Sequence, residues 1–181
     1  MKELYGWEDI MPRNVEIKAR VHDFESLRKR AAQLADSPVE VIEQLDTFYL
    51  TPRGRLKLRV LAPDRCELIQ YSRPDDSSAK TSTYDIVRSD DPASFSRILE
   101  SALPIRGVVT KRRHLYLVGP TRIHLDEVEG LGTFMELEVV LSKGQTTEYG
   151  TAIAKDLMQK LGIQSDDLIS GAYIDLLESQ A

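Results

Sequence analysis

The segment Leu125–Leu141 constrains the fold of this chain most strongly, because its side chains alternate in polarity. In its second half, one face of an extended strand is apolar and the other face carries Glu136 and Glu138. The residues just before it place polar side chains on one face of a preceding strand: Arg122, His124 and Asp126. The pattern therefore predicts two consecutive β-strands, each with one apolar and one polar face.

A turn at Glu129–Gly132 joins these two strands, so the segment is predicted to form a β-hairpin. The turn contains Gly-Leu-Gly, which also occurs in phosphate-binding loops, but no helix follows it, and we interpret it as a turn only. In such a hairpin, Asp126, Glu136 and Glu138 can point into one space.

The same alternation recurs elsewhere in the chain. Residues 14–21, 55–60 and 108–118 have charged faces that carry, in order, Glu16 with Lys18 and Arg20, Lys57 with Arg59, and Lys111 with Arg113. Further strands are predicted at residues 39–50, 66–73 and 81–88. Helices are predicted after Asp23, from Asp91 to Pro104, over 147–161, and from Ser165 through Leu177.

The sequence predicts about eight strands with charge on one face and four amphipathic helices. All of these elements must bury their apolar surfaces against one another. The economical solution is an α+β fold in which a closed antiparallel β-barrel turns its apolar face outward beneath flanking helices and lines a water-filled tunnel with charge. Residues 11–181 are expected to form this single domain, and residues 1–10, which show no period, are interpreted as an N-terminal extension or tag.

Composition narrows the class of protein. A net charge of -5 argues against a nucleic-acid binder with a broad basic surface. The chain has neither a run of about 20 apolar residues nor a signal-peptide pattern, so no membrane partner is expected. Cys66 is the single cysteine, which fits a reducing, cytoplasmic location. Nothing in the sequence indicates an oligomeric state.

The predicted tunnel carries many basic and several acidic side chains, which together suggest a ligand. Lys and Arg from several strands suit a long polyanion, because each charge-assisted contact is worth about 1.5–3 kcal/mol. Clustered carboxylates would repel that anion unless a divalent cation, Mg²⁺ or Mn²⁺, bridged them to its oxygens. The residues alone therefore predict metal-dependent binding of a triphosphate as a small-molecule partner.

Four motifs carry a resemblance to a known family. They are the hairpin Leu125–Leu141, Asn14-x-Glu16-x-Lys18, Gln44-x-Asp46-x-Phe48-Tyr49 and Ala172–Leu177. Together they resemble the CYTH superfamily of triphosphate tunnel metalloenzymes, closest to its class IV adenylyl cyclase-like branch. The usual first motif is Glu-x-Glu-x-Lys, so Asn14 replaces an acid, and Ala172 replaces a serine. An amide brings no charge, so we expect weaker binding of a second metal ion.

The resemblance implies roles for individual residues. It implies Asp126 and Lys18 as catalytic residues and Glu16, Glu136, Glu138 and Asp126 as ligands of Mg²⁺ or Mn²⁺. With the strand faces, it also implies a triphosphate-binding set: Lys18, Arg20, Lys57, Arg59, Arg73, Lys80, Lys111 and Arg113. His124 shares the face of Asp126, and Tyr173 is interpreted as a core or lid residue.

The reaction itself is left open by these motifs. Hydrolysis of tripolyphosphate or a nucleoside triphosphate is the favoured interpretation, and a class IV-type cyclase that makes cyclic AMP and pyrophosphate from ATP is the alternative. Asn14 motivates a third hypothesis, a protein that binds triphosphates without processing them. A β-protein with an ordinary core and no ligand is the fourth.

Overall fold

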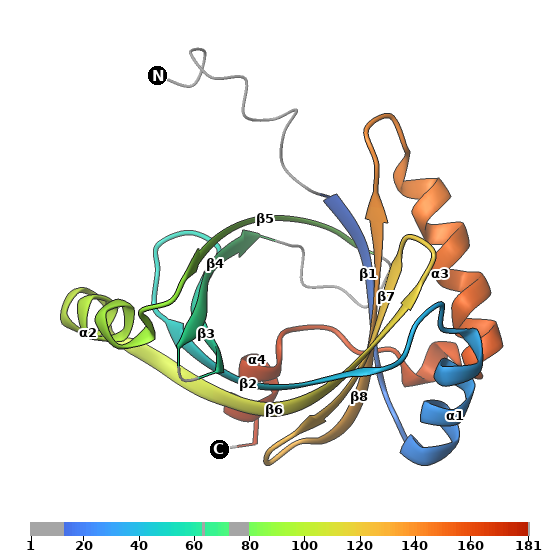
Figure 1. The fold of residues 1–181 in the computed structure, drawn as a ribbon, viewed down its shortest axis with the longest axis horizontal. Coiled ribbons are helices and arrows are strands. Elements are labelled where there is room, and N and C mark those ends of the chain that lie inside the picture. The colour runs from blue at the N-terminus through green and yellow to red at the C-terminus, as the bar shows by residue number, and fades with distance from the viewer. Residues whose placement is uncertain (1–12, 63, 73–79, 181) are drawn as a thin grey trace.

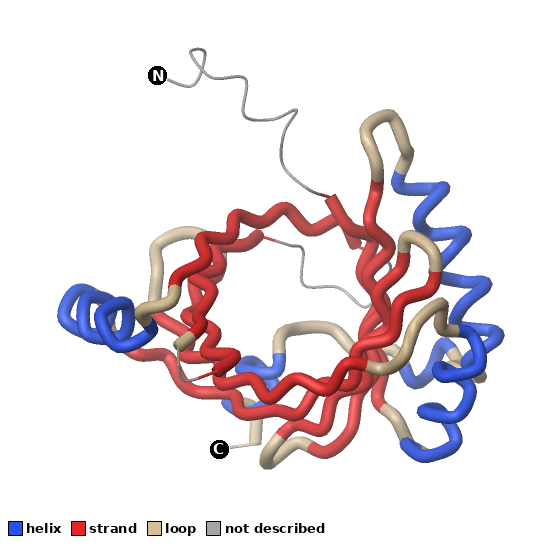
Figure 2. Tube along the Cα trace, viewed as in Figure 1, coloured by secondary structure: helices blue, strands red, loops and turns tan. Residues whose placement is uncertain are grey.

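In the computed structural model, which describes residues 13–62, 64–72 and 80–180, eight antiparallel strands form a strongly curled sheet with helices outside it (Figures 1 and 2). The strands are β1 (Arg13–Arg20), β2 (Glu40–Tyr49), β3 (Arg55–Ala62), β4 (Arg65–Ser72), β5 (Lys80–Ser89), β6 (Ile105–Val118), β7 (Thr121–Val128) and β8 (Gly132–Leu141). The helices are α1 (Phe24–Leu34), α2 (Pro92–Ala102), α3 (Thr147–Leu161), the 3-10 turn η3 (Ser165–Asp167) and α4 (Tyr173–Glu178).

The hydrogen-bonded order of the strands runs β1-β5-β4-β3-β2-β6-β7-β8 and returns to β1. β1 pairs with β8 along its whole length, from Arg13 to Arg20. Its pairing with β5 is much shorter, and joins only residues 13–16 to residues 80–83 among the described residues. The predicted number of strands, their antiparallel order and their curl are therefore confirmed, while closure is limited to this short seam.

The apolar faces of β1, β7 and β8 point outward and pack beneath α1 and α3, which lie together on one side of the sheet (Figure 1). Met135, Leu137 and Val139 of β8 have no exposed surface, and Leu157 of α3 is buried in the same cluster. The largest hydrophobic cluster of the described residues thus lies outside the sheet, as the alternation predicts, and leaves the polar faces for the interior.

The opposite side of the sheet has a thinner cover. Helix α2 packs there against a small cluster formed by Tyr49, Leu58 and Cys66. None of the residues of α2 is fully buried, although Phe95 and Leu99 contact the cluster. None of the described helices combines the length and the apolar character needed to cross a bilayer.

The helices begin and end at the predicted signals. Asp23 caps α1 by accepting a hydrogen bond from the backbone N–H of Ser26 at 2.9 Å, and Asp91 caps α2 through Ser94 at 3.0 Å. Helix α3 ends at Gly162, whose φ of 74° lies in the left-handed region that glycine adopts readily.

The prediction of one helix from Ser165 through Leu177 is wrong. After η3 the chain instead lies along β1: Leu168 forms a bridge with Ala19, and the N–H of Ile169 donates to the carbonyl of Lys18 at 3.0 Å. These backbone bonds to a distant strand compete with the helical ones. Helix α4 begins only after this crossing, and it places Tyr173 inside the curl of the sheet.

Candidate functional site

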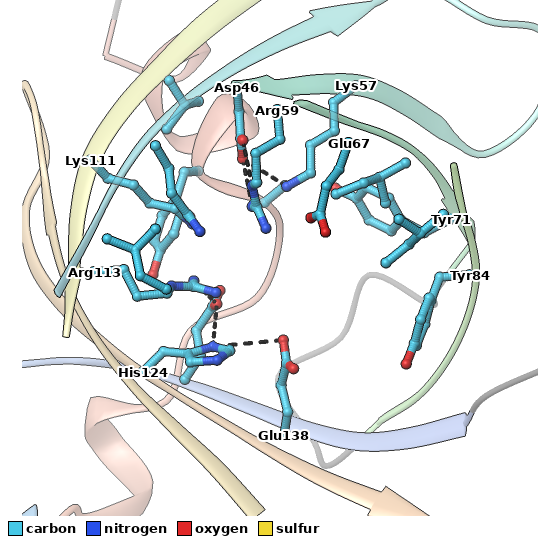
Figure 3. Close-up of a pocket in the computed structure, with 18 of the residues that line it drawn as sticks. Asp46, Lys57, Arg59, Glu67, Tyr71, Tyr84, Lys111, Arg113, His124 and Glu138 are labelled. Atoms are coloured by element: carbon cyan, nitrogen blue, oxygen red, sulfur yellow. Dashed lines mark hydrogen bonds and ion pairs between the residues drawn. The ribbon is translucent and has the colours of Figure 1, made fainter. Parts of the chain in front are cut away.

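A cavity of about 350 Å³ lies inside the curled sheet and is lined by side chains from all eight strands (Figure 3). The polar faces predicted from the sequence supply most of its polar and charged lining: Glu16, Lys18, Lys57, Arg59, Glu67, Lys111, Arg113, Arg122, His124, Glu136 and Glu138. Alternation thus assigned these side chains to the interior correctly. Asp46 and Arg88 also line the cavity. The cavity is therefore highly charged, as expected for a site that binds a polyanion.

An acidic group lies on the β7–β8 side of the cavity. Ligand atoms of His124, Glu136 and Glu138 all lie within 4.8 Å of one another. The strand register creates this group, because His124 of β7 is paired with Glu136 of β8, while Glu138 is paired with Glu16 of β1. Lys18 is the β1 partner of Glu136. We call His124, Glu136 and Glu138 the acidic patch. Strand β1 adds Glu16 and Lys18 beside it, so three neighbouring strands contribute to this side of the cavity.

Cations surround the two carboxylates of this patch. Lys18 Nζ lies 3.0 Å from Glu136, Arg113 donates to the same carboxylate at 2.7 Å, and Arg122 forms an ion pair with Glu138 at 3.2 Å. Burial raises the pKa of Glu136, but Lys18, His124 and Arg113 outweigh it and hold the pKa well below its usual range. Glu136 is therefore ionised at neutral pH.

Burial also has the largest effect on the pKa of His124. It lowers the pKa of the imidazole, and the neighbouring Arg113 lowers it further, while Glu138 and Glu136 act in the opposite direction. The net result is a pKa below the ordinary value, which favours the neutral ring.

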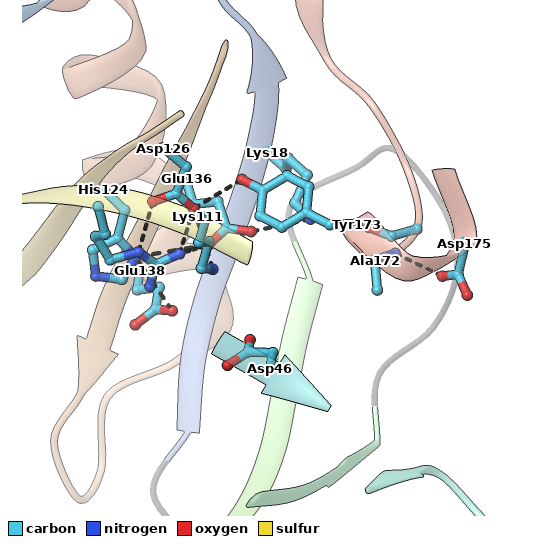
Figure 4. Close-up of polar contacts among 12 residues, drawn as sticks. Lys18, Asp46, Lys111, His124, Asp126, Glu136, Glu138, Ala172, Tyr173 and Asp175 are labelled. Carbon is cyan, nitrogen blue, oxygen red and sulfur yellow. Dashed lines mark hydrogen bonds and ion pairs between the residues drawn. The ribbon is translucent and has the colours of Figure 1, made fainter. Parts of the chain in front are cut away.

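Asp126, predicted as a metal ligand and catalytic residue, lies deeper than the strand pattern indicated. It has no exposed surface and does not line the cavity. Arg113 donates to both of its oxygens at 2.7 and 2.6 Å, Tyr173 donates at 3.0 Å, and Lys111 lies 3.4 Å away (Figure 4). Arg113 is the cross-strand partner of Asp126 and lies between it and the cavity. In the free protein Asp126 therefore contacts basic side chains rather than the cavity, and its role as a metal ligand or catalytic residue stays a prediction.

A second buried carboxylate plays the same part across the cavity. Asp46 of β2 is 2% exposed and accepts hydrogen bonds from Arg59 at 2.7 and 2.8 Å and from Lys57 at 2.7 Å. Burial and the charge of Arg59 lower the pKa of Lys57 to about 7, and burial with the charge of Arg113 lowers the pKa of Lys111 to about 8. Both lysines can therefore gain a full charge when an anion arrives.

The predicted binding residues are not all in the cavity. Lys18, Lys57, Arg59, Lys111 and Arg113 line it, as do the predicted metal ligands Glu16, Glu136 and Glu138. Arg73 lies outside the described residues. The backbone of Lys80 pairs with Glu16, but the side chain of Lys80 is likewise outside the description.

Arg20 is the exception among the described basic residues. Its side chain is exposed, and its guanidinium lies over the ring of Phe134, 5.1 Å from the centroid. Phe134 in turn packs against Tyr173, with ring centroids 5.0 Å apart, and Tyr173 lines the cavity. The two rings fill the interior at this level, so Arg20 does not line the cavity as the strand parity indicated, and its role in substrate binding stays a prediction.

Two functional candidates, Asp46 and Gln44, received no role from the sequence, and a third, Asn14, was singled out only as a missing acid. Asp46 lay within a family motif but was given no role, and the buried Gln44 lines the cavity beside it. Asn14 is 2% exposed, and its Oδ1 makes no hydrogen bond. All three lie on polar strand faces, so the alternation that revealed the charged residues also marks them.

The fold and the cavity together define a class of protein: a curled antiparallel sheet that encloses basic side chains around an acidic patch, suited to polyanions and divalent cations. Comparison with known proteins agrees, because the CYTH domain family matches residues 12–173, and the chain belongs to that family. The predicted family resemblance is therefore confirmed.

Relatives of the chain are similar along nearly its whole length. Adenylate cyclase CyaB of Aeromonas hydrophila is 26% identical over 172 residues, which cover 91% of this chain and 88% of that protein. The structure of the PH1012 protein from Pyrococcus horikoshii superposes with a TM-score of 0.80 at 25% identity, over 90% of this chain and 98% of that one.

A more distant structure comes from Hippeastrum. It is the adenylyl cyclase-type protein HpAC1, described as having a dominant triphosphatase activity, and it superposes with a TM-score of 0.67 at 15% identity. The match covers 94% of this chain and 96% of that one, and at this identity it shows the fold alone.

Members of the CYTH family depend on divalent cations, and the acidic patch fits one. Two carboxylates and a neutral imidazole supply oxygen and nitrogen ligands, and the Nδ1 of His124 is a buried atom without a hydrogen bond. Glu16, Glu136, Glu138 and His124 are the described residues that could hold the ion.

Proposed function

We propose that this protein binds a triphosphate, either inorganic tripolyphosphate or a nucleoside triphosphate, inside the cavity and hydrolyses it with the help of a divalent cation. One observation supports this most strongly. Five basic side chains from β1, β3 and β6 line a single cavity that also contains the acidic patch: Lys18, Lys57, Arg59, Lys111 and Arg113.

The basic side chains are held in place by buried carboxylates. Asp46 holds Lys57 and Arg59, and Asp126 holds Arg113 and Lys111, so these cations do not need to be ordered when the anion binds. Arg113 and Arg59 can each offer further N–H groups to phosphate oxygens. We infer that this arrangement stabilises the charge on the transferring phosphoryl group.

A divalent cation on Glu16, Glu136 and Glu138 would neutralise phosphate charge and polarise the bond to be broken. Lys18 lies 3.0 Å from Glu136 and under the ring of Tyr173, 3.8 Å from its centroid, so its ammonium is fixed at the edge of the acidic patch. We assign Lys18 to the terminal phosphate and retain it as a catalytic residue. Asp126 is assigned a positioning role.

A class IV-type adenylyl cyclase is the alternative, and one feature of the cavity favours it. On the β4–β5 side, Tyr71 and Tyr84 line the cavity (Figure 3), and Ile86 adds apolar surface beside them. Such a surface could hold a nucleobase while the phosphates reach the basic side chains. The similarity to Adenylate cyclase CyaB supports the same alternative.

Phosphorus NMR of the full chain tests the proposal. The protein is incubated separately with tripolyphosphate and with ATP, each with Mg²⁺ and with Mn²⁺. Glu138→Gln removes one charge from the acidic patch, and Glu67→Gln is the matched control, because Glu67 lines the same cavity but lies outside that patch.

Orthophosphate release that Glu138→Gln abolishes and Glu67→Gln retains would support hydrolysis. Cyclic AMP with pyrophosphate from ATP would overturn it in favour of the cyclase. If neither product forms while triphosphates still raise the melting temperature, the protein binds without turnover, and the replacement of an acid by Asn14 becomes the explanation. Cytoplasmic location stays a prediction from the single cysteine.

A further inference from the structure

His124 is the least expected member of the acidic patch. The side chain is 4% exposed and lines the cavity, and its Nδ1 makes no hydrogen bond. Nδ1 lies 3.8 Å from Oε2 of Glu136 and 3.7 Å from Oε1 of Glu138, which is too far for hydrogen bonds. A buried ring nitrogen without a partner is costly, so a ligand at this point would remove a real penalty.

The two distances suit a shared cation. Two ligand atoms that each lie about 2.1 Å from a metal ion can be separated by at most about 4.2 Å, and 3.7 and 3.8 Å fall within that limit. One ion can therefore contact the nitrogen together with an oxygen of either carboxylate, and ligand atoms of all three side chains lie within 4.8 Å of one another.

We propose that His124 Nδ1 is a direct ligand of the divalent cation, together with Glu136 and Glu138, and that it sets the preference among metal ions. This inference rests on the proposed function, since it concerns the same metal site. Imidazole favours Co²⁺, Zn²⁺ and other later transition metals, whereas Mg²⁺ prefers oxygen ligands and retains its water. His124 therefore makes the site more selective for transition metals than a purely carboxylate site would be.

Asn14 strengthens the argument from the other side of the patch. Asn14 lies on the same face of β1 as Glu16, and Glu16 is paired with Glu138. With an amide at this position, fewer charges attract the ion, so a neutral nitrogen ligand contributes a larger share of its affinity.

Arg113 also donates to Oε2 of Glu136 at 2.7 Å, so a metal ion must share that oxygen with a guanidinium.

The experiment uses the full chain without substrate and observes the imidazole nitrogens directly. The chain has three histidines, and ¹⁵N–¹H correlation spectra of ¹⁵N-histidine-labelled protein are recorded during titration with Zn²⁺ and, separately, with Mg²⁺. Calorimetry measures the affinity for Zn²⁺, Co²⁺ and Mg²⁺. His124→Phe keeps an aromatic ring but removes the nitrogen.

His114→Phe is the matched control. His114 is 6% exposed on the neighbouring strand β6, but it points away from the cavity, where Nε2 lies 3.1 Å from Glu127 and the ring packs against Phe24. We expect Zn²⁺ to shift the Nδ1 resonance of His124 alone, and His124→Phe to weaken Zn²⁺ and Co²⁺ binding at least about tenfold. Mg²⁺ affinity should change less than threefold, and His114→Phe should leave all three affinities unchanged.

Zn²⁺ that binds without moving the Nδ1 resonance of His124 would overturn the proposal, because the carboxylates alone would then hold the ion. Absence of metal binding to the unmodified chain would overturn it as well. Failure of the proposed function gives a different result: if His124 ligates Zn²⁺ but no triphosphate is processed, the ligand assignment stands and the hydrolase does not.

Discussion

The wall of the cavity formed by β1, β7 and β8 and the wall formed by β3, β4 and β5 differ in both chemistry and support. The first carries the acidic patch, and its outer face lies under α1 and α3 with the largest hydrophobic cluster of the described residues. The second carries Lys57 and Arg59 with aromatic side chains, and among the described residues it is backed by the small cluster around Tyr49, Leu58 and Cys66.

The difference suggests a division of labour. A metal ion requires ligands held within a few tenths of an ångström, which a fully packed wall provides. Phosphate oxygens and a nucleobase tolerate small shifts, so the more thinly backed wall can serve them. We therefore call these two parts the metal wall (β1, β7 and β8) and the binding wall (β3, β4 and β5), and the predictions below test whether the distinction is real.

Loss of a buried carboxylate should have the largest effect on stability, and it should be greater at the metal wall. Asp126→Asn leaves Arg113 and Lys111, whose side chains are 6% and 3% exposed, without their main counter-charge. We expect it to lower the free energy of unfolding by about 3–5 kcal/mol, because a buried charge loses its partner. Urea denaturation measures this value.

Asp46→Asn is the matching change on the other side. Its partners Lys57 and Arg59 are each 12% exposed, compared with 3% for Lys111 and 6% for Arg113, so water in the cavity solvates them better. We expect a smaller loss of about 1–3 kcal/mol. Equal losses for the two variants would contradict the claim that the metal wall is the more tightly built.

Deletion of core side chains compares the support of the two walls directly. Leu137 of β8 is 0% exposed beneath α3, and Leu58 of β3 is 1% exposed beneath α2. We expect Leu137→Ala to cost about 3 kcal/mol and Leu58→Ala about 2 kcal/mol, because the half-buried α2 can settle into the space that Leu58 leaves. Thermal and urea unfolding of both variants give the values, and a larger loss at Leu58 would reverse the ranking.

The affinity of the binding wall for tripolyphosphate should depend on pH, because Lys57 titrates near neutral pH. The guanidinium of Arg113 stays charged over the same range. Lys57 has a pKa of about 7 in the free protein, below its unfolded value of 10.5, so it is only partly charged at neutral pH. Tripolyphosphate binds best when this lysine is protonated. We therefore expect the dissociation constant measured by calorimetry without metal to rise about tenfold between pH 7 and pH 9.

Lys57→Arg provides the control, since a guanidinium keeps its charge throughout this range. Its dissociation constant should rise less steeply, with the ionisation of the ligand itself common to both proteins. The stability of the free protein should rise over the range of pH in which the affinity for tripolyphosphate falls. The unfolded chain binds more protons at Lys57 between about pH 7 and pH 10, so the contribution of this group to stability increases as the pH rises through that window. Parallel binding curves for the two proteins would exclude Lys57 as the responsive group.

Strand alternation predicted which side chains face the interior, and it did so for Glu16, Glu136 and Glu138 because parity depends only on local geometry. Parity does not give the depth of a residue along the tunnel. Arg20 has the correct parity but lies where Phe134 and Tyr173 fill the interior.

Parity also does not show which groups shield one another. Asp126 has the correct parity too, yet Arg113 on the adjacent strand covers it, and that contact depends on the register between β6 and β7. The division of the C-terminal segment could not be predicted for a similar reason, since the bridge from Leu168 to Ala19 joins residues far apart in the sequence.

The smallest effect expected concerns one hydroxyl group that packs beside each wall, Tyr173 of α4 beside the metal wall and Tyr49 of β2 beside the binding wall. Tyr173 Oη donates to Asp126 at 3.0 Å, whereas the buried Oη of Tyr49, near Ser96 of α2, has no hydrogen bond of acceptable geometry. Tyr173→Phe should therefore lower the free energy of unfolding by about 1 kcal/mol, and Tyr49→Phe should leave it unchanged or raise it slightly. The phenyl ring in the Tyr173→Phe variant should keep the contact that the Tyr173 ring makes with Lys18. Triphosphate affinity should therefore change less than the free energy of unfolding. Urea denaturation and calorimetry of both variants separate the two effects. If both substitutions lower the free energy of unfolding equally, the hydrogen bond from Tyr173 to Asp126 contributes no more than the contacts of the Tyr49 hydroxyl. The distinction between the two walls would then rest on hydrophobic packing alone.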